Sequence, residues 1–403
     1  MNILFLTLVE INSVEDRGIY QDLLRKFRNE GHDVTIVTPV ERRKGISTNF
    51  SKKENVSILQ VKTFNIQKTN IIEKGIGTLA IEYQYLSAIK EYVTDKKFDL
   101  VLYSTPPITF TNIIRFIKER DGAKTYLLLK DIFPQNAVDM KLMSNTSFLF
   151  KYFRKKEKQL YSISDRIGCM SKANVDFVLK HNHYIQQDKI EINPNSVEIQ
   201  YFKELELGEK SKIKSKFKIP ENKKTFIYGG NLGKPQGIDF LISTLNSKKD
   251  DENAFFVIVG SGTEYYKIED WIKKNNPKNV LFLAALPKNE YDLLVQVCDV
   301  GLIFLHKDFT IPNYPSRLLS YLEFKMPVLA ATDSNTDVGL DLLKNKCGLA
   351  VISNDLQNMV NAIDSFLDMD VDTFEEMRQN SFRFLQKDFQ VKDSYYKIIK
   401  SLM

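Results

Sequence analysis

The chain has 403 residues, of which 43% are hydrophobic and 27% are charged. This composition is typical of a globular protein and excludes a disordered chain, and the length predicts two or three domains. The cysteines Cys169, Cys298 and Cys347 are far apart and form no C-x-x-C pair, which indicates reduced thiols in a cytoplasmic protein. With four histidines, no metal site is expected, and no apolar run approaches the ~20 residues of a membrane-spanning helix.

The net charge of +6 is unevenly distributed. Residues 1–190 contain 30 Lys and Arg against 21 Asp and Glu, whereas the remainder contains 27 against 30. A basic first half favours an anionic partner such as lipid headgroups or phosphates; ordinary solvated charge is the alternative. Nucleic acid is not expected, because the basic residues are not interleaved with a recognisable RNA- or DNA-binding module.

The first half alternates short apolar runs with helical sequence. Residues 2–9 form an apolar run, a loop with Gly18 follows, and apolar residues from Ile19 to Phe27 recur at helical spacing. Residues 33–39 form the next apolar run, which completes the opening of a βαβ unit. Further strands are expected at 56–62, 98–104, 124–130, 166–171 and 189–195, with helices at 78–93 and 109–120 among the segments between them.

The same pattern restarts at residue 224. The strand runs there are short and continuously apolar, as in parallel strands buried on both faces. Strands are expected at 224–230, 254–262, 279–286, 299–305, 326–333 and 348–353, and helices at 237–248, 265–275, 289–298, 316–325 and over most of 373–403.

The two patterns predict an α/β protein made of two doubly wound, Rossmann-like domains. The boundary is expected near the polar, Lys-rich stretch 203–223. We therefore predict a first domain at 1–200, a second at 201–385, and a C-terminal helix at 386–403 that packs back on the first domain.

The stretch KTFIYGGNLGKPQG (224–237) places Gly229, Gly230 and Gly233 where a strand gives way to a helix. In open α/β sheets, ligands bind beyond the carboxyl ends of the strands, and unpaired N–H groups at a helix start attract phosphate. The glycines would let the backbone approach a diphosphate, and Lys234 adds positive charge. The spacing is not G-x-G-x-x-G, so a dinucleotide is not expected. The alternative is a tight turn without a ligand.

A second loop, 308–330, contains two prolines and leads into a helix. Ser316 is a candidate N-cap, and Arg317 lies in the first helical turn. An arginine near a helix start is unfavourable for the helix dipole unless an anion is present, so Arg317 is a candidate phosphate ligand. A solvent-exposed arginine is the alternative.

Two further features of the first half are candidates for function. Asp131 ends a predicted strand, where its carboxylate could orient a substrate or act as a base; the alternative is that it caps the next turn. The segment FLFKYFRKKEKQLY (148–161) combines aromatic residues with five basic residues and one acid, Glu157. Such a segment can lie on an anionic bilayer. The alternative is an amphipathic helix that packs Phe148, Tyr152 and Phe153 inward.

Several of these stretches, in this order, resemble the family 4 retaining glycosyltransferases, which have the GT-B architecture of two facing Rossmann-like domains with a cleft between them. The segment KDIFPQNA (130–137) is similar to a D-x-W-P-type segment of a bacterial surface-polysaccharide subgroup. The other stretches are GIYQDLLRKFRNEGHDVTIVTP, SDRIGCMSKANVDFVLKHN, INPNSV, YGGNLGKPQG, VIVGSGTE and YPSRLLSYLEFKMPVLA.

The resemblance implies that a nucleotide-diphosphate sugar binds mainly to the second domain and that the acceptor approaches from the first. The loop 230–237 would hold the diphosphate, and backbone near Ala285 and Leu286 would contact the base. The residues implied in catalysis are Asp131, Lys234 and Arg317. The residues implied in donor binding are Gly18, Gly230, Asn231, Leu232, Gly233, Gln236, Gly260, Ala285, Leu286, Tyr314, Pro315, Ser316, Leu318, Ser320 and Glu323.

The chain departs from the family pattern at four positions, two in the glycine-containing loop and two in or just after the later loop. Asn231 and Gln236 stand where the phosphate loop of the family usually has Arg and Lys. Pro312 and Ser320 stand where it often has two Glu. Lys234, Arg317 and backbone N–H groups would therefore carry more of the phosphate binding.

The resemblance implies a hexosyl- or N-acetylhexosaminyltransferase that uses a UDP-sugar, retains configuration, and needs no metal or cofactor. The acceptor would be a glycan or an undecaprenyl-diphosphate-linked glycan in capsule, O-antigen or exopolysaccharide synthesis. The enzyme would be cytoplasmic and peripherally attached to the inner face of the plasma membrane. A sugar-nucleotide epimerase of similar architecture and a non-catalytic nucleotide-sugar-binding subunit remain alternatives.

Overall fold

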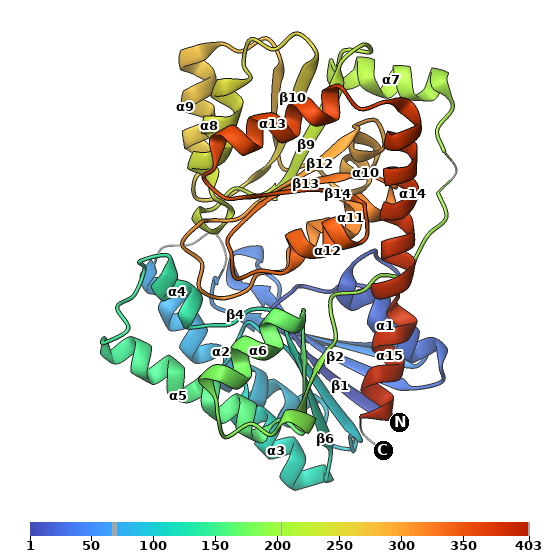
Figure 1. Cartoon of the computed structure of the whole chain (residues 1–403). Coiled ribbons are helices and arrows are strands. Elements are labelled where there is room, and N and C mark those ends of the chain that lie inside the picture. The colour runs from blue at the N-terminus through green and yellow to red at the C-terminus, as the bar shows by residue number, and fades with distance from the viewer. Residues whose placement is uncertain (67–70, 203, 402–403) are drawn as a thin grey trace. The chain divides into compact units, whose positions relative to one another are not determined.

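The computed structural model describes residues 1–66, 71–202 and 204–401 of the chain (Figure 1). They divide into two units, Met1–Glu198 together with Gln390–Met403, and Ile199–Phe389. We call these the first unit and the second unit. The C-terminal segment belongs to the first unit, although it follows the second unit in the sequence.

The described part of the first unit contains an eight-stranded sheet in the order β3-β4-β2-β1-β5-β6-β7-β8. Neighbouring strands are parallel, except that β3 is antiparallel to β4. The chain begins in the middle at β1, builds outward to β4, and then returns to β5 on the other side of β1. The strands are β1 Asn2–Leu6, β2 Asp33–Glu41, β3 Asn49–Lys53, β4 Val56–Thr63, β5 Leu100–Ser104, β6 Lys124–Leu129, β7 Arg166–Cys169 and β8 Ile190–Ile192.

The C-terminal helix α15 lies beside α1, and the two cover one face of this sheet (Figure 1). Phe27 of α1 and Tyr395 of α15 meet edge to face with ring centroids 4.9 Å apart, and Ile398 is fully buried in the same core. The helices of the first unit are α1 Ile19–Asn29, α2 Ile71–Tyr92, α3 Thr111–Asp121, α4 Gln135–Asp139, α5 Phe148–Ile163, α6 Lys172–His181 and α15 Val391–Lys400.

The described part of the second unit contains a six-stranded parallel sheet in the order β11-β10-β9-β12-β13-β14. Its chain also starts in the middle, moves outward through β10 to β11, and returns to β12 on the other side of β9. The carboxyl ends of β9 and β12 therefore flank a topological switch point, the usual ligand position in such sheets. The strands are β9 Lys224–Asn231, β10 Ala254–Ser261, β11 Val280–Ala284, β12 Val300–Phe304, β13 Val328–Thr332 and β14 Gly348–Ile352.

Helices pack on both faces of this second sheet. On one face, α8 and α13 join a core that contains Phe226, Phe256 and Leu302. On the other face, the Tyr321 ring of α11 lies so close to Gly301 that a side chain there would approach it to 2.4 Å. The helices are α7 Leu207–Phe217, α8 Ile238–Ser247, α9 Tyr265–Asn275, α10 Lys288–Gln296, α11 Arg317–Glu323, α12 Val338–Lys344, α13 Leu356–Leu367 and α14 Val371–Asp388.

The predicted fold class, two doubly wound α/β units, is confirmed, and each predicted strand is present. The prediction missed β3, an edge strand with four of its five residues exposed, because such a strand needs no apolar face. It also missed α7, which lies in the stretch 203–223 and has no buried residue. A capping box between Glu206 and Glu209 starts α7, and this local signal does not depend on a hydrophobic pattern.

The packing of α15 gives a test of the first unit. We expect Ile398→Ala to lower the free energy of unfolding by about 2–5 kcal/mol, because it leaves a cavity in a fully buried core. Lys392→Ala, on the exposed side of the same helix, is the matched control and should change it by less than about 0.5 kcal/mol. Urea unfolding followed by circular dichroism measures both, and equal midpoints for the two variants would contradict the packing described.

Candidate functional site

β9 ends in a turn whose backbone excludes side chains. A Cβ atom on Gly229 would lie 2.1 Å from the Tyr291 hydroxyl, and Gly230 has a φ of 120°, which side chains rarely allow. Gly237, with a φ of 57°, then forms the N-cap of α8. The sequence therefore uses glycine here both for close approach and for backbone conformation, at the switch point of the sheet.

The middle of this turn is held by neighbouring backbone. The Leu232 N–H donates to the Ser261 carbonyl at 2.9 Å, and the Leu232 carbonyl accepts from Glu264 at 2.9 Å. Gly260 is needed on the facing strand, since its Cβ atom would lie 1.9 Å from the Gly230 carbonyl oxygen. Leu232 itself is fully buried in the core. Leu232 therefore fixes the conformation of the turn. Its N–H is not available to a ligand, because it is hydrogen-bonded to the Ser261 carbonyl.

The remaining loop residues form local contacts. The Asn231 amide donates to Gln236 Oε1 at 2.8 Å, so the two residues that replace the basic residues of the family pair with each other. Lys234 begins a short 3-10 helix, Lys234–Gln236. The backbone N–H of His306 supports this helix by donating to the Pro235 carbonyl at 2.9 Å. Burial lowers the pKa of the His306 imidazole, and the positive charge of Lys234 acts in the same direction. The loop is thus anchored to the end of β12.

Arg317, the first residue of α11, lies against this turn. Its guanidinium carbon is 4.3 Å from the centroid of the Tyr228 ring, and Nη2 is 3.6 Å from the Cβ position of Gly230. Its Nη1 is buried and has no hydrogen-bond partner among the described residues. The turn therefore has a guanidinium group with donor capacity to spare beside its glycine backbone.

Three tyrosines, Tyr228, Tyr321 and Tyr291, lie around this arginine, and we call them the tyrosine cage. Burial lowers the pKa of Arg317 and interactions with these tyrosines raise it on balance, so the guanidinium keeps the charge that arginine ordinarily has. Burial raises the pKa of Tyr321 to about 12, and it also raises the pKa of Tyr228 and Tyr291. The site thus presents one permanent positive charge inside a cage of neutral phenols.

Tyr321 ties α11 to the strands that carry the turn. Its hydroxyl accepts the Gly229 N–H at 3.2 Å and lies 3.1 Å from the Ile227 carbonyl and 3.3 Å from the Leu302 carbonyl. A single side chain therefore joins α11, β9 and β12. Because Arg317 is four residues earlier on the same helix, this joint also fixes the position of the guanidinium.

The other predicted residues of the late loop have mixed positions. Ser316 is the N-cap of α11, but its side chain makes no capping hydrogen bond and its backbone is helical, so the expected side-chain cap is absent. Tyr314 and Leu318 are buried, and the Tyr314 hydroxyl donates to Asp341 at 2.9 Å. Ser320 Oγ is buried and has no hydrogen-bond partner among the described residues. Pro315 is partly exposed, and Glu323 is buried at the far end of α11.

The remaining predicted residues lie outside the glycine turn and the late loop. Ala285 is exposed and Leu286 is half-buried, just after β11. Gly18 belongs to the first unit, where it is the N-cap of α1. Asp131, also in the first unit, follows β6; both of its carboxylate oxygens accept from the Asn136 amide at 3.0 Å, and burial raises its pKa. The carboxylate therefore helps to hold the turn after β6 and is at the same time poised to accept a proton.

Sequence reasoning missed the tyrosine cage. Tyr321 could have been found, because its spacing of four residues from Arg317 places both on one face of a helix. Tyr228, inside an apolar strand, gave no distinguishing signal. Tyr291 comes from α10, a separate helix, and only the tertiary fold brings it to Gly229.

The basic segment of the first unit forms helix α5 (Phe148–Ile163). Phe153 packs inward, but Phe148 is 85% exposed and Leu149 is 49% exposed, so the inward packing considered for Phe148 is not observed. α5 and α3 border a groove of about 730 Å³. The basic residues that line it are Arg115, Lys151, Arg154, Lys155 and Lys158.

These cations differ in their partners. Arg154 forms an ion pair with the buried carboxylate of Glu157 and donates to Asn182 at 2.8 Å. In the described part of the chain, no ion pair involves Lys151, Lys155 or Lys158. Three ammonium groups on α5 thus remain available to an external anion.

A search of the described residues found no helix with the length and hydrophobicity needed to cross a membrane. Within the same residues, no group of three or more His, Cys, Asp or Glu side chains is arranged to hold a metal ion.

The hydrogen bonds through which Tyr321 joins α11 to β9 and β12 can be tested by removing its hydroxyl oxygen. We expect Tyr321→Phe to lower the free energy of unfolding by about 1–3 kcal/mol, because the buried N–H of Gly229 and two carbonyls lose their partner. Tyr266→Phe, an exposed tyrosine of the same unit, is the control and should have no measurable effect. Urea unfolding measures the free energy of unfolding of both variants. A Tyr321→Phe variant as stable as the Tyr266→Phe control would refute this role of the hydroxyl.

Comparison with known proteins agrees with this architecture. Residues 209–384 match the family Glycosyl transferases group 1. The chain is 22% identical over 306 residues to "Probable glycosyltransferase WbjE" of Pseudomonas aeruginosa, which covers 75% of this chain and 74% of that protein. It is 21% identical over 339 residues to "Putative colanic acid biosynthesis glycosyl transferase WcaI" of Escherichia coli K12, with 80% of each chain covered.

The fold has counterparts among solved structures. The crystal structure of Anabaena Alr3699/HepE in complex with UDP and glucose matches with a TM-score of 0.71 and 13% identity, over 100% of this chain and 99% of that one. This likeness confirms the predicted two-domain GT-B fold. The residues that match the family Glycosyl transferases group 1, 209–384, contain the glycine turn and Arg317.

Proposed function

We propose that this protein is a retaining glycosyltransferase that moves a hexosyl or N-acetylhexosaminyl group from a UDP-sugar to a glycan acceptor. The acceptor proposed is a glycan or an undecaprenyl-diphosphate-linked glycan of capsule, O-antigen or exopolysaccharide synthesis. The observation that carries the proposal is the buried Arg317 guanidinium beside Gly230, within the residues that match the group 1 glycosyltransferase family. The similarity to WcaI, a putative colanic acid biosynthesis glycosyl transferase, supports the polysaccharide part of the proposal, and the HepE structure in complex with UDP and glucose supports the UDP part.

The chemistry requires a leaving group to be stabilised. When the bond between the anomeric carbon and the diphosphate breaks, positive charge develops on the sugar and negative charge on the diphosphate. Preorganised donors aimed at that charge lower the barrier, and each well-placed donor is worth about 3–4 kcal/mol. Arg317 fits this role, because the Tyr228 ring holds its guanidinium beside Gly230 and its Nη1 has no hydrogen-bond partner among the described residues.

The acceptor hydroxyl attacks from the face that the diphosphate leaves, and a diphosphate oxygen takes its proton. This sequence of bond changes retains the configuration at the anomeric carbon. The proposal includes no metal ion and no organic cofactor, since Arg317, Lys234 and the N–H groups of the turn supply the positive charge. Asp131 is proposed to orient the acceptor on the first unit, where its burial favours proton acceptance.

We further propose that α5 attaches the protein to the inner face of the plasma membrane. Phe148 and Leu149 are exposed at its start, and Lys151, Lys155 and Lys158 make no ion pair among the described residues. Basic residues near an anionic bilayer contribute about 1 kcal/mol each, and exposed apolar side chains add to binding. A lipid-linked acceptor would be presented at that surface.

A donor panel tests the reaction. Purified protein is incubated with UDP-, GDP- and ADP-sugars, with and without EDTA, and free nucleotide diphosphate is measured. We expect slow release from one UDP-sugar that EDTA does not change. Recovery of an epimerised nucleotide sugar would favour an epimerase instead. Binding without turnover, even with lipid-linked acceptors present, would favour a non-catalytic subunit.

Variants of Arg317 test the leaving-group role. We expect Arg317→Ala to lower donor hydrolysis by about 100- to 1,000-fold, because a preorganised donor is lost. Arg317→Lys should recover only part of this loss, since an ammonium group cannot stack flat on Tyr228 or donate through a planar fork. Lys278→Ala, an exposed lysine of the same unit, is the charge-matched control. An Arg317→Ala variant that keeps full activity and a normal melting temperature would exclude the proposed role.

Vesicle flotation tests the membrane contact. The wild-type protein should float with anionic phosphatidylglycerol vesicles and not with neutral phosphatidylcholine vesicles. Replacing Lys151, Lys155 and Lys158 with Gln should weaken binding by about 100-fold, from roughly 1 kcal/mol per lysine. The control replaces the exposed Lys52, Lys97 and Lys124 of the same unit with Gln, which changes the net charge equally. Equal loss in the two triple variants would indicate general charge attraction and contradict a role for α5.

A further inference from the structure

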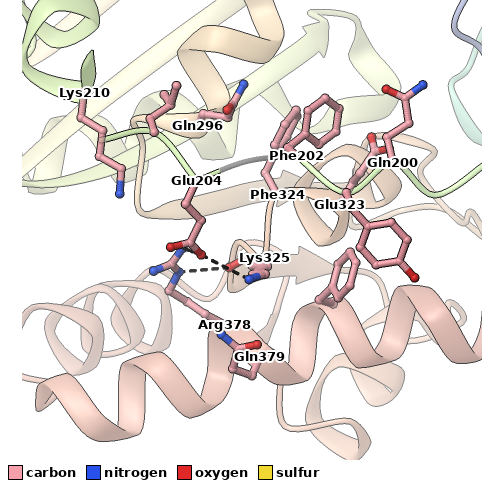
Figure 2. Close-up of a pocket in the computed structure, with 13 residues that line it drawn as sticks. Gln200, Phe202, Glu204, Lys210, Gln296, Glu323, Phe324, Lys325, Arg378 and Gln379 are labelled. Carbon is pink, nitrogen blue, oxygen red and sulfur yellow. Dashed lines mark hydrogen bonds and ion pairs between the residues drawn. The ribbon is translucent and has the colours of Figure 1, made fainter. Parts of the chain in front are cut away.

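The second unit contains a cavity of about 280 Å³ at the C-terminal end of α11, the helix that begins at Arg317. Figure 2 shows the residues that line it. The walls of the cavity come from residues 200–202 and 204–205, from α7, α10 and α14, and from the residues that end α11. The cavity thus lies where the chain enters the second unit, and the glycine turn does not contribute to it.

One side of the cavity is cationic. Lys325 Nζ lies 3.2 Å from the Glu204 carboxylate, and Arg378 Nη2 lies 3.9 Å from it (Figure 2). Lys210 also lines the cavity, and the hydrogen bond from Lys325 lowers the pKa of the Glu204 carboxyl, with Arg378 and Lys210 acting in the same direction. The Glu204 side chain is 59% exposed. The cations are therefore arranged around a carboxylate that an external anion could replace.

The backbone of Lys325 ends α11 in the left-handed region, as the backbone of Lys346 does after α12. It has a φ of 54°, where a glycine would be favoured. Arg378 Nε donates to its carbonyl at 3.4 Å. Because Lys346 ends α12 with the same backbone geometry, what distinguishes Lys325 is its ammonium, which lines the cavity beside Glu204 and Arg378.

The other side of the cavity is aromatic. Phe202 and Phe324 lie with ring centroids 4.8 Å apart, and Tyr201 and Phe382 lie 5.9 Å apart. Tyr201 is 80% exposed, so its ring can move to accommodate a ligand without disturbing the core. Flat aromatic walls next to cations favour a ligand that carries both a planar ring and an anionic group.

We propose that this cavity binds a small organic anion in which a planar ring carries a phosphate or carboxylate group. The anionic group takes the place of the Glu204 carboxylate between Lys325 and Arg378, and the ring lies among Tyr201, Phe324 and Phe382. This proposal does not rest on the proposed transferase activity. Together with the diphosphate proposed to bind at Arg317, this ligand would place one anion at each end of α11.

The test uses phenyl phosphate as the probe and inorganic phosphate as the comparison, with binding to the full chain measured by calorimetry. Wild-type protein should bind phenyl phosphate at least about tenfold more tightly than inorganic phosphate, because the ring adds apolar contacts. Glu204→Gln should tighten phenyl phosphate binding by about three- to tenfold, since it removes the competing carboxylate. Arg378→Gln should weaken it by about tenfold or more.

Two further variants separate binding from folding and from the glycine turn. Lys325→Gly removes one cation but relieves the left-handed backbone, so the protein should be at least as stable as wild type and bind the probe more weakly. Arg317→Ala should leave probe binding unchanged. The proposal is overturned if Glu204→Gln fails to tighten binding, if the two phosphates bind alike, or if Arg317→Ala abolishes probe binding.

Discussion

The second unit depends on one constraint, which is the burial of a guanidinium group against a glycine turn. A buried charge is costly unless it is paired or well solvated by the protein. Here no carboxylate pairs with Arg317 in the contacts described; its guanidinium lies on the Tyr228 ring, and its Nη1 is buried without a hydrogen-bond partner among the described residues. An anion bound beside it would supply that partner.

The same constraint explains the glycines. Gly229 must lack a side chain because the Tyr291 hydroxyl occupies that space, and Gly230 must adopt a positive φ as its backbone passes Arg317. The turn is thus shaped by the residues that hold the cation. The pairing of Asn231 with Gln236 fits this arrangement, because the loop itself no longer supplies arginine or lysine at those positions. Positive charge comes instead from Arg317 of α11 and from Lys234.

The sequence was sufficient to predict the fold because parallel strands buried on both faces have short, continuously apolar runs that glycine and polar loops separate. It also placed the glycine turn and Arg317 correctly as neighbours of a strand end and a helix start. It could not predict that Tyr291, from α10, meets Gly229, since that contact depends on how α10 packs on the sheet. The side-chain cap expected at Ser316 failed for a similar reason: the residue is helical, and tertiary contacts at Arg317 and Tyr321 fix the start of α11 instead.

Both ends of α11 break local rules. An arginine at the first position opposes the helix dipole, and a lysine in the left-handed region beyond the last position is conformationally unfavourable. A helix of seven residues gains little stability of its own, so neither choice can be explained by helix formation. Each is instead matched by tertiary chemistry that an anion would complete: the tyrosine cage and glycine turn at one end, and the Arg378 and aromatic walls at the other. Lys346 follows α12 in the same left-handed conformation, so it is the position of the Lys325 ammonium beside Glu204 and Arg378, and not its backbone, that favours an anion-binding role at this end of α11.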